Sequence, residues 1–211
     1  MDAGRLGRIN SDEFMTEGKP QVVVIAGPNG AGKSTLAPFL LRDTFGVLEY
    51  VNADPIALGL SAFDSASMSV EAGRIVVTRL RDLAKRRKSF AFETTLASRF
   101  YAPWLRRLRE SGFKFHLVFL WLSSIELAIE RVEERVRSGG HSIPEEVIRR
   151  RYDRGLTNFF NLYQPLADTW AAYDNSGSGT PLLVSAGGEN IPQRVIRPYT
   201  WNMLLSWQNE G

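Results

Sequence analysis

Gly27-Pro28-Asn29-Gly30-Ala31-Gly32-Lys33-Ser34-Thr35 is the stretch that decides the fold, because it contains the whole pattern Gly-x-x-x-x-Gly-Lys-Ser of a phosphate-binding loop (P-loop). The backbone N–H groups of such a loop surround the phosphates of a nucleotide, the lysine reaches the β- and γ-phosphates, and the serine hydroxyl ligates Mg²⁺. We therefore predict that these nine residues bind a nucleoside triphosphate, that Lys33 is catalytic and that Ser34 holds the metal ion.

The segments on both sides of the loop support this interpretation. Residues 21–26 are an apolar, β-branched run typical of a buried strand, and a helix opens at Ser34 with Pro38 expected in its first turn. A helix that begins at the loop also directs the positive end of its dipole at the phosphates. The alternative, a glycine-rich turn with no ligand, is disfavoured by this order of strand, loop and helix.

Composition and charge set further bounds. The chain has 211 residues, 44% of them hydrophobic, so we expect a single P-loop domain over residues 21–211, preceded by a flexible polar tail over 1–20. Cysteine is absent, which excludes disulfides and thiolate metal sites. A net charge of +3 suits phosphate-rich ligands without requiring nucleic acid, which is not an expected partner. No apolar run reaches the ~18 residues of a membrane span, and we predict a cytoplasmic protein.

The rest of the chain alternates strand and helix patterns. Strands are expected at 21–26, 47–51, 89–95, 113–122 and 182–185, and helices at about 34–42, 68–87, 99–111, 124–138 and 144–161, with an alternative end of the last helix at 173, after Pro165. This alternation predicts an α/β fold of the P-loop NTPase type, with a parallel sheet covered by helices on both faces. Ligands of such folds bind at the carboxyl ends of the strands, where the P-loop lies.

Asp54 ends the second expected strand, 21 positions after Lys33. Phosphoryl transfer to an alcohol needs a carboxylate that accepts the hydroxyl proton and aligns the oxygen with the γ-phosphorus. Asp54 is a candidate for this catalytic base. The other interpretation is that Asp54 caps a helix starting at Pro55, and one residue can do both.

Glu93 ends the third expected strand, and Thr95 follows two positions later. An acidic residue beside the P-loop strand commonly holds Mg²⁺ through water. Glu93 is therefore predicted either to do this or to bind substrate hydroxyls together with Thr95. A merely solvated strand end is less favoured, because Glu93 follows Phe-Ala-Phe at the catalytic edge.

A helix, two glycines and a second helix over about 131–154 are expected to form a helical lid, as in nucleotide kinases. Lid arginines stabilise charge on a transferred phosphoryl group and help to exclude water. We expect Arg131 to reach phosphate first, with Arg135 and Arg137 as further lid candidates, while most lid arginines make ordinary ion pairs with neighbouring glutamates. His141, after Gly139-Gly140, is expected to order the lid turn.

These motifs, taken in order, resemble the zeta-toxin family of P-loop kinases, and most of all its chromosomal relatives, which are often labelled predicted ATPases. The resemblance covers about residues 21–176. It rests on the P-loop, on Asn-Ala-Asp at 52–54, on Phe-Glu-Thr-Thr-Leu at 92–96, on the arginine-rich stretch 131–144 and on residues 165–175.

The resemblance implies an ATP- and Mg²⁺-dependent kinase, since zeta toxins phosphorylate a sugar hydroxyl of UDP-N-acetylglucosamine. By this likeness Lys33 is the P-loop lysine, Asp54 the base, Glu93 and Thr95 the substrate-binding pair, and Arg131 the phosphate clamp. One departure concerns the acceptor: the family motif places an arginine two residues past the threonine, where this chain has Ala97.

Two alternatives remain open at this point. The first is a polynucleotide 5′-hydroxyl kinase or another small-molecule kinase, since these also place an aspartate about twenty residues after the P-loop lysine. The second is a nucleotide-dependent switch whose output is protein binding, with an antitoxin as partner. A GTPase is disfavoured because the sequence lacks Asn-Lys-x-Asp.

Overall fold

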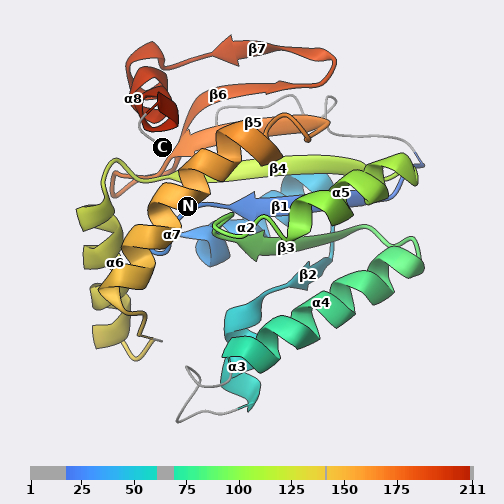
Figure 1. Ribbon diagram of the computed structural model, residues 1–211, viewed down its shortest axis with the longest axis horizontal. Coiled ribbons are helices and arrows are strands. Elements are labelled where there is room, and N and C mark those ends of the chain that lie inside the picture. The colour runs from blue at the N-terminus through green and yellow to red at the C-terminus, as the bar shows by residue number, and fades with distance from the viewer. Residues whose placement is uncertain (1–17, 61–68, 141, 210–211) are drawn as a thin grey trace.

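The computed structural model describes residues 18–60, 69–140 and 142–209. Its centre is a seven-stranded sheet in the order β2-β3-β1-β4-β5-β6-β7 (Figure 1). The strands are β1 (Gln21–Ala26), β2 (Glu49–Val51), β3 (Phe90–Thr94), β4 (Lys114–Trp121), β5 (Thr169–Asp174), β6 (Leu182–Gly188) and β7 (Ile191–Val195). Most of the predicted tail over 1–20 lies outside the described residues.

The first five strands are parallel, and β1 lies between β3 and β4. Val24 is paired with Phe92 on one side and with Leu117 on the other, and all three side chains are buried. Strands that are covered on both faces contain almost continuous apolar runs, which is the pattern of these three segments. The carboxyl ends of β1, β3 and β4 therefore meet at one edge, with the P-loop after β1.

Helices cover both faces of this sheet. In Figure 1, α5 and α7 lie in front of the sheet, α2 lies behind it, and α6 stands beside the edge where β1 ends. The helices are α2 (Lys33–Leu40), α3 (Ala53–Leu60), α4 (Ser69–Lys85), α5 (Tyr101–Glu110), α6 (Ile125–Arg137), α7 (Glu145–Asn158) and α8 (Pro198–Asn209), and the π-helical turns are η2 (Leu41–Phe45) and η3 (Phe159–Tyr163). The predicted α/β fold of the P-loop type is confirmed.

Three details differ from the sequence-based predictions. The sheet is mostly rather than wholly parallel, because β6 and β7 are antiparallel to their neighbours. Residues 169–174 form β5 and not a continuation of α7, which gives way to the turn η3 before Pro165. Pro38 lies in the second turn of α2, since this helix begins at Lys33.

The C-terminal residues complete the core beside α7. The ring of Trp201 on α8 stacks on Trp170 of β5, with centroids 5.7 Å apart, and meets Phe160 edge-on. Trp207 contacts Tyr152 of α7. These aromatic contacts bury large apolar areas and fix α7 against the sheet. Within the described residues, no helix is both long enough and apolar enough to span a bilayer.

Candidate active site

The P-loop connects β1 to α2, and its first glycine is required by close packing. Gly27 has a φ of 140°, and a Cβ atom there would lie 2.1 Å from the carbonyl oxygen of Leu120 on β4. Only glycine fits this position. Gly32, with φ 78°, precedes the first residue of α2. The loop therefore places backbone N–H groups and a helix N-terminus at the edge of the sheet, which is an arrangement that binds phosphate.

Lys33 lies at the start of α2, and its ammonium group is folded back onto the loop. Its Nζ donates hydrogen bonds to the carbonyl oxygens of Gly27 (3.0 Å) and Pro28 (2.8 Å). Burial lowers the pKa of Lys33, and the nearby carboxylates of Glu93 and Asp54 oppose this shift. Charge-assisted bonds to phosphate are stronger than bonds to neutral carbonyls. We therefore expect Lys33 to exchange these carbonyls for a bound nucleotide.

Ser34 and Glu93 meet directly at the carboxyl end of β3. The Ser34 hydroxyl lies 2.9 Å and 3.1 Å from the two carboxylate oxygens of Glu93, and the Tyr50 hydroxyl donates to Glu93 Oε2 at 2.8 Å. Burial is the main cause that raises the pKa of the Tyr50 hydroxyl, and the negative charge of Glu93 raises it further. The hydroxyl therefore stays neutral and can donate its hydrogen bond. Asn52 Nδ2 is 3.3 Å from Ser34 Oγ. This network fixes the carboxylate of Glu93 beside the P-loop hydroxyl.

The oxygen atoms of Ser34 and Glu93 suit a magnesium ion. Mg²⁺ prefers carboxylate, hydroxyl, phosphate and water oxygens, and it is usually held by one or two protein side chains with waters and substrate phosphates. In the described part of the chain there is no group of three or more His, Cys, Asp or Glu side chains that could hold a metal. The Ser34 hydroxyl and the Glu93 carboxylate are the oxygens that could hold a nucleotide-bound Mg²⁺ at this edge.

Asp54 lies in the first turn of α3, and another residue caps that helix. The backbone N–H of Asp54 donates to Asn52 Oδ1 at 2.9 Å, which is the bond that an N-terminal cap makes. The side chain of Asp54 is 56% exposed, and its Oδ2 lies 4.0 Å from Nη1 of Arg135 on α6. The carboxylate thus remains available to an incoming hydroxyl group.

Two arginines, one on α6 and one on α7, approach this space. Arg135 lies near Asp54, as described above. Arg151 on α7 is half-buried, and burial together with the charge of Arg150 lowers its pKa while Asp54 raises it. The positive charges of Arg135 and Arg151 both act on Lys33. Arg135 and Arg151 therefore lie near enough to Lys33 and Asp54 for their charges to act on these groups.

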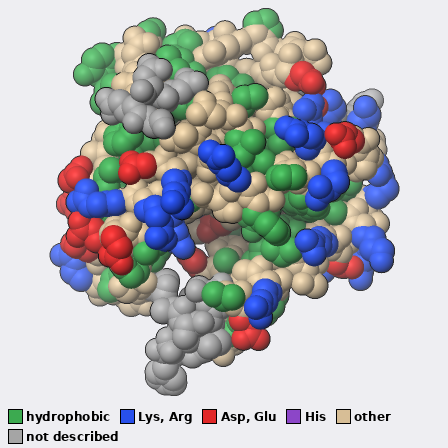
Figure 2. Space-filling view, viewed as in Figure 1, with side chains coloured by type: hydrophobic (Ala, Val, Ile, Leu, Met, Phe, Trp, Pro, Cys, Tyr) green, Lys and Arg blue, Asp and Glu red, His purple; other side chains and the backbone are tan. Residues whose placement is uncertain are grey.

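Figure 2 shows a hollow in this face of the molecule where β3 ends, with acidic side chains visible inside it.

The other two predicted lid residues are Arg137 and His141. Arg137 is exposed in the last turn of α6, and His141 lies outside the described residues.

Arg131 contacts a different part of the site. Its Nη1 donates to the carbonyl oxygen of Asn175 at 2.7 Å, and its Nη2 donates to those of Ser176 and Gly177, both at 3.0 Å. Asn175 Nδ2 in turn donates to the carbonyl of Ala31 in the P-loop at 2.9 Å. Arg131 thus ties α6 to the turn after β5, and this turn is tied to the P-loop.

Thr95 lies on the turn that follows β3, and α7 holds this turn in place. Asn158 Nδ2 donates to the carbonyl of Leu96 at 2.7 Å, and Leu96 is buried with a φ of 58°. A Cβ atom on Gly155 would lie 2.5 Å from the carbonyl oxygen of Thr95. The backbone of α7 at Gly155 therefore packs directly against the backbone of this turn. Thr95 follows Glu93 by two positions and lies at the same edge of the sheet.

A comparison with protein families matches residues 22–160 to a family described as an AAA domain. The chain belongs to this AAA-domain family. An uncharacterized protein of Haemophilus influenzae is 29% identical over 132 residues, which are 63% of this chain and 92% of that protein. The matched family region contains the P-loop, Asp54, Glu93 and the arginines of α6 and α7.

Two solved structures share the fold of this chain. A chain of the AvrRxo1-ORF1:-ORF2 structure with ATP superposes with a TM-score of 0.72 at 17% identity, covering 94% of this chain and 67% of that one. A chain of the PezAT chromosomal toxin–antitoxin system of Streptococcus pneumoniae gives a TM-score of 0.60 at 14% identity, covering 93% and 88%. These likenesses show that the chain shares the fold of these two proteins.

Four further side chains complete the site, and sequence reasoning did not assign them. They are Tyr50, Asn52, Arg151 and Asn175. A sequence pattern could have indicated Arg151. The buried side of α7 contains Ile148, Tyr152 and Gly155, and helical spacing places Arg151 next to this buried side. The bonds of Tyr50 and Asn52 to Glu93 and Ser34 depend on strand pairing, which no local pattern reveals.

Proposed function

We propose that this AAA-domain protein is a kinase that transfers the γ-phosphoryl group of ATP to a hydroxyl group of a small acceptor. The observation that carries the proposal is the exposed Asp54 carboxylate. It does not cap its helix, because Asn52 does, and it lies 4.0 Å from Arg135 and near enough to Lys33 for their charges to interact. A switch that only binds nucleotide has no need for a carboxylate at this point.

In the proposed reaction the acceptor hydroxyl gives its proton to a carboxylate oxygen of Asp54. The hydroxyl oxygen then forms a bond to the γ-phosphorus, the bond from that phosphorus to the bridging oxygen breaks, and ADP leaves. Lys33 and the P-loop N–H groups hold the β- and γ-phosphates. Bound Mg²⁺, held by Ser34 with Glu93, would neutralise negative charge on these phosphates.

The arginines have separate roles in this proposal. Arg135 and Arg151 stabilise the charge of the transferring phosphoryl group, since both lie with Lys33 and Asp54. Arg131 positions the nucleotide side of the site, because its guanidinium group already binds three carbonyls of the 175–177 turn. The segment from the second half of α6 to the first half of α7 is the proposed lid, and Arg137 and His141 belong to it.

The resemblance to zeta toxins supports a nucleotide sugar such as UDP-N-acetylglucosamine as the acceptor. Thr95, on the turn after β3, is the side chain we propose for acceptor binding, and Glu93 contributes mainly through Ser34 and Mg²⁺. The alanine at position 97 leaves a family arginine position without charge. A polynucleotide 5′-hydroxyl group is therefore the acceptor to test beside UDP-sugars.

An antitoxin partner is a second proposal, and it rests on the neighbours in fold. The AvrRxo1-ORF1:-ORF2 and PezAT structures are complexes or toxin–antitoxin systems by description. In this view the kinase works in the cytoplasm and a small protein controls it. Co-purification of the chain with the product of an adjacent gene, lost on separate expression, would support this partner.

The experiment that tests the function is a screen with γ-labelled ATP against UDP-sugars, nucleosides and oligonucleotides. Asp54→Asn should abolish transfer to whichever acceptor is labelled, while Lys33→Ala should also weaken ATP binding. Asp43→Asn, an exposed aspartate in η2, is the matched control and should behave as wild type. Wild-type transfer by Asp54→Asn would refute the base assignment, and ATP binding without transfer to any acceptor would favour the switch.

A further inference from the structure

The positive charge of the chain is concentrated on two neighbouring helices, α4 and α5. Residues 69–114, from the start of α4 to the first residue of β4, contain 12 of the 26 Lys and Arg residues and 4 of the 23 Asp and Glu residues. This segment has a formal charge of +8, so the other residues together carry −5. Figure 2 shows Lys and Arg side chains gathered over the part of this face where Figure 1 places α4 and α5. The net charge of +3 therefore does not reveal that one surface is strongly basic.

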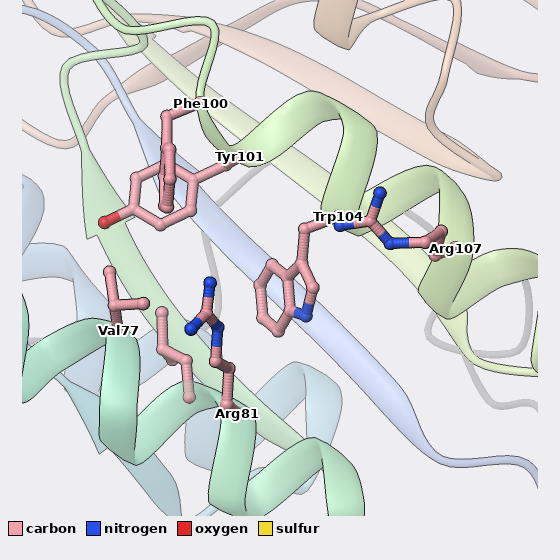
Figure 3. Close-up of a pocket in the computed structure, with 7 residues that line it drawn as sticks. Val77, Arg81, Phe100, Tyr101, Trp104 and Arg107 are labelled. Atoms are coloured by element: carbon pink, nitrogen blue, oxygen red, sulfur yellow. The ribbon is translucent and has the colours of Figure 1, made fainter.

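A groove runs between α4 and α5 on this surface, and we call it the α4–α5 groove (Figure 3). Helix α4 contributes Val77 and Arg81, while Phe100, Trp104 and Arg107 line the side of α5. Phe100 is 56% exposed, and Trp104 is partly exposed above the apolar core. The α5 side of the groove therefore presents aromatic rings to the solvent.

The α4 side of the groove carries a row of cations. Residues three or four apart lie on the same side of a helix, which aligns Arg74 and Lys85 with Val77 and Arg81 of the groove. This row spans ~17 Å of helix. Its three cations are exposed, and none of them forms an ion pair with another described residue. Arg106 on α5 is unpaired in the same sense, so the feature that distinguishes the groove is a row of cations that faces aromatic rings.

Cations beside exposed aromatic rings are the composition of surfaces that bind single-stranded nucleic acid. The phosphates of such a strand meet the cations, and its unpaired bases stack on the rings whatever their sequence. We propose that the α4–α5 groove binds a single-stranded polynucleotide. Its bases stack on Phe100 and Trp104, and its phosphates lie along Arg81, Lys85 and Arg107.

A polynucleotide fits this groove better than an acidic protein segment does. Both ligands bring negative charge to the cations of α4. A polynucleotide also carries a flat base for every phosphate, so it can cover the aromatic side of the groove over the same length, whereas a peptide does so only at its aromatic residues. A double strand is disfavoured, because its bases are stacked on one another and cannot reach Phe100 or Trp104.

The groove begins on the acceptor side of the proposed active site. Phe100 is five residues past Thr95, and α4 packs against α3, the helix that carries Asp54. In Figure 1 both α4 and α5 begin at the side of the sheet where β3 ends. On the proposed kinase function, on which this role rests, the bound strand is the acceptor. Its 5′ oxygen forms the bond to the γ-phosphorus, the proton of that hydroxyl goes to Asp54, and ADP leaves.

Equilibrium binding of a fluorescein-labelled oligothymidylate of about 12 nucleotides tests the groove without any chemistry. Fluorescence anisotropy with the full-length protein, without ATP, is measured at a series of salt concentrations. The variant Arg81→Gln with Arg107→Gln removes two cations of the groove, and Phe100→Ser removes its exposed ring. The matched control, Arg42→Gln with Arg197→Gln, removes two exposed cations, one in η2 and one directly before α8.

We expect the two kinds of variant to differ in their salt dependence. Loss of Arg81 and Arg107 should weaken binding about tenfold and reduce the slope of log affinity against log salt by about 1.4, because two phosphate contacts are lost. Phe100→Ser should weaken binding about tenfold at an unchanged slope, because stacking involves no counterions. The control should bind as wild type does. An equal loss of affinity in the control, or no binding by wild type at low salt, would overturn the proposal.

Competition separates the polynucleotide from an acidic protein segment. Polyglutamate of the same number of charges should displace the labelled strand far less well than unlabelled oligothymidylate does, because it offers no rings to Phe100 and Trp104. Equal displacement by the two competitors would assign the groove to an acidic protein segment and overturn the proposal.

Phosphoryl transfer separates failure of the groove from failure of the kinase. With a 5′-hydroxyl oligothymidylate as acceptor, Phe100→Ser should raise the KM for the oligonucleotide about tenfold and leave the KM for ATP unchanged. Wild type that binds the strand but labels no acceptor at all would refute the kinase and leave binding in the groove established. Transfer to a UDP-sugar by a protein that binds no oligonucleotide would refute the groove and leave the kinase standing.

Discussion

Asn52 Oδ1 accepts the backbone N–H of Asp54 at 2.9 Å, so the residue two positions before the proposed base caps the helix that carries it. This separates two roles that the sequence left combined in Asp54. The same amide donates through Nδ2 to Ser34 Oγ at 3.3 Å. Asn52 therefore connects the start of α3 with the P-loop, and it fixes the distance between the proposed base and the phosphate site.

The first prediction follows from this bond. Asn52→Ala should cost about 1 kcal/mol of stability, the usual effect of losing an N-terminal cap, and should also reduce phosphoryl transfer because Asp54 is then less well positioned. Asn52→Ser restores a capping oxygen but cannot reach Ser34 in the same way. It should recover stability more than activity. Urea unfolding and γ-labelled ATP transfer measure the two effects, and equal recovery of both would contradict the separate roles.

The second prediction concerns Arg151. Arg151→Met should lower the rate of phosphoryl transfer by about 10²- to 10³-fold, the effect of losing one charge that stabilises a transition state, with a smaller change in the KM for ATP. Arg150→Met is the matched control, since Arg150 is the exposed neighbour on the same helix. Equal rates for the two variants would show that Arg151 only packs α7.

How far the sequence could predict this site depends on the residue. The P-loop, β1 and the position of Glu93 beside β1 follow from local patterns, and the structure places each as expected. That Arg131 binds phosphate stays a prediction, and in the structure its guanidinium group binds the carbonyls of the 175–177 turn. A guanidinium can reach several partners from one helical position, so the choice depends on a turn that is 44 residues away in the sequence.

Contacts between segments that are distant in the sequence also explain why β5 forms where the sequence predicted the end of a helix. Thr169–Asp174 contains Trp-Ala-Ala-Tyr, with no alternation of polar and apolar residues, because β5 is buried on both faces between β4 and β6. Alanine favours helices in isolation. Here pairing along the whole of β5 with β4 overrides that preference, and short apolar runs cannot be assigned from periodicity alone.

The third prediction is a pH dependence that arises away from the site. His116 on β4 is buried, its Nδ1 lies 2.7 Å from Thr169 Oγ1, and burial lowers its pKa to about 4, with Asp168 opposing and Lys114 adding to the shift. The folded state thus binds the proton less tightly than the unfolded chain, whose histidine has a pKa near 6.5. This contribution is complete above pH 6.5 and favours unfolding progressively as the pH falls toward 4.

The variant His116→Gln removes this titration. Wild type should lose up to about 3 kcal/mol more stability than His116→Gln between pH 7 and pH 4, a figure that corresponds to the pKa difference. Chemical unfolding at a series of pH values measures it. The two proteins share their carboxylates, so parallel stability curves would mean that His116 titrates normally in the folded protein.

The last prediction uses two glycines inside helices. A Cβ atom on Gly155 of α7 would lie 2.5 Å from the carbonyl oxygen of Thr95, whereas one on Gly73 of α4 would meet nothing within 4 Å. Gly73→Ala should therefore stabilise the protein by about 0.5–1 kcal/mol through helix propensity. Gly155→Ala gains the same propensity but must push α7 away from the turn after β3.

We expect Gly155→Ala to destabilise the protein by about 1–3 kcal/mol, the range for overpacking. It should also raise the KM for the acceptor more than the KM for ATP, because Thr95 moves while the P-loop stays in place. Thermal unfolding gives the first effect, and steady-state kinetics with the acceptor found in the screen gives the second. If both glycine variants were stabilised alike, α7 would not touch the turn of Thr95, and Asn158 could not hold Leu96 as described.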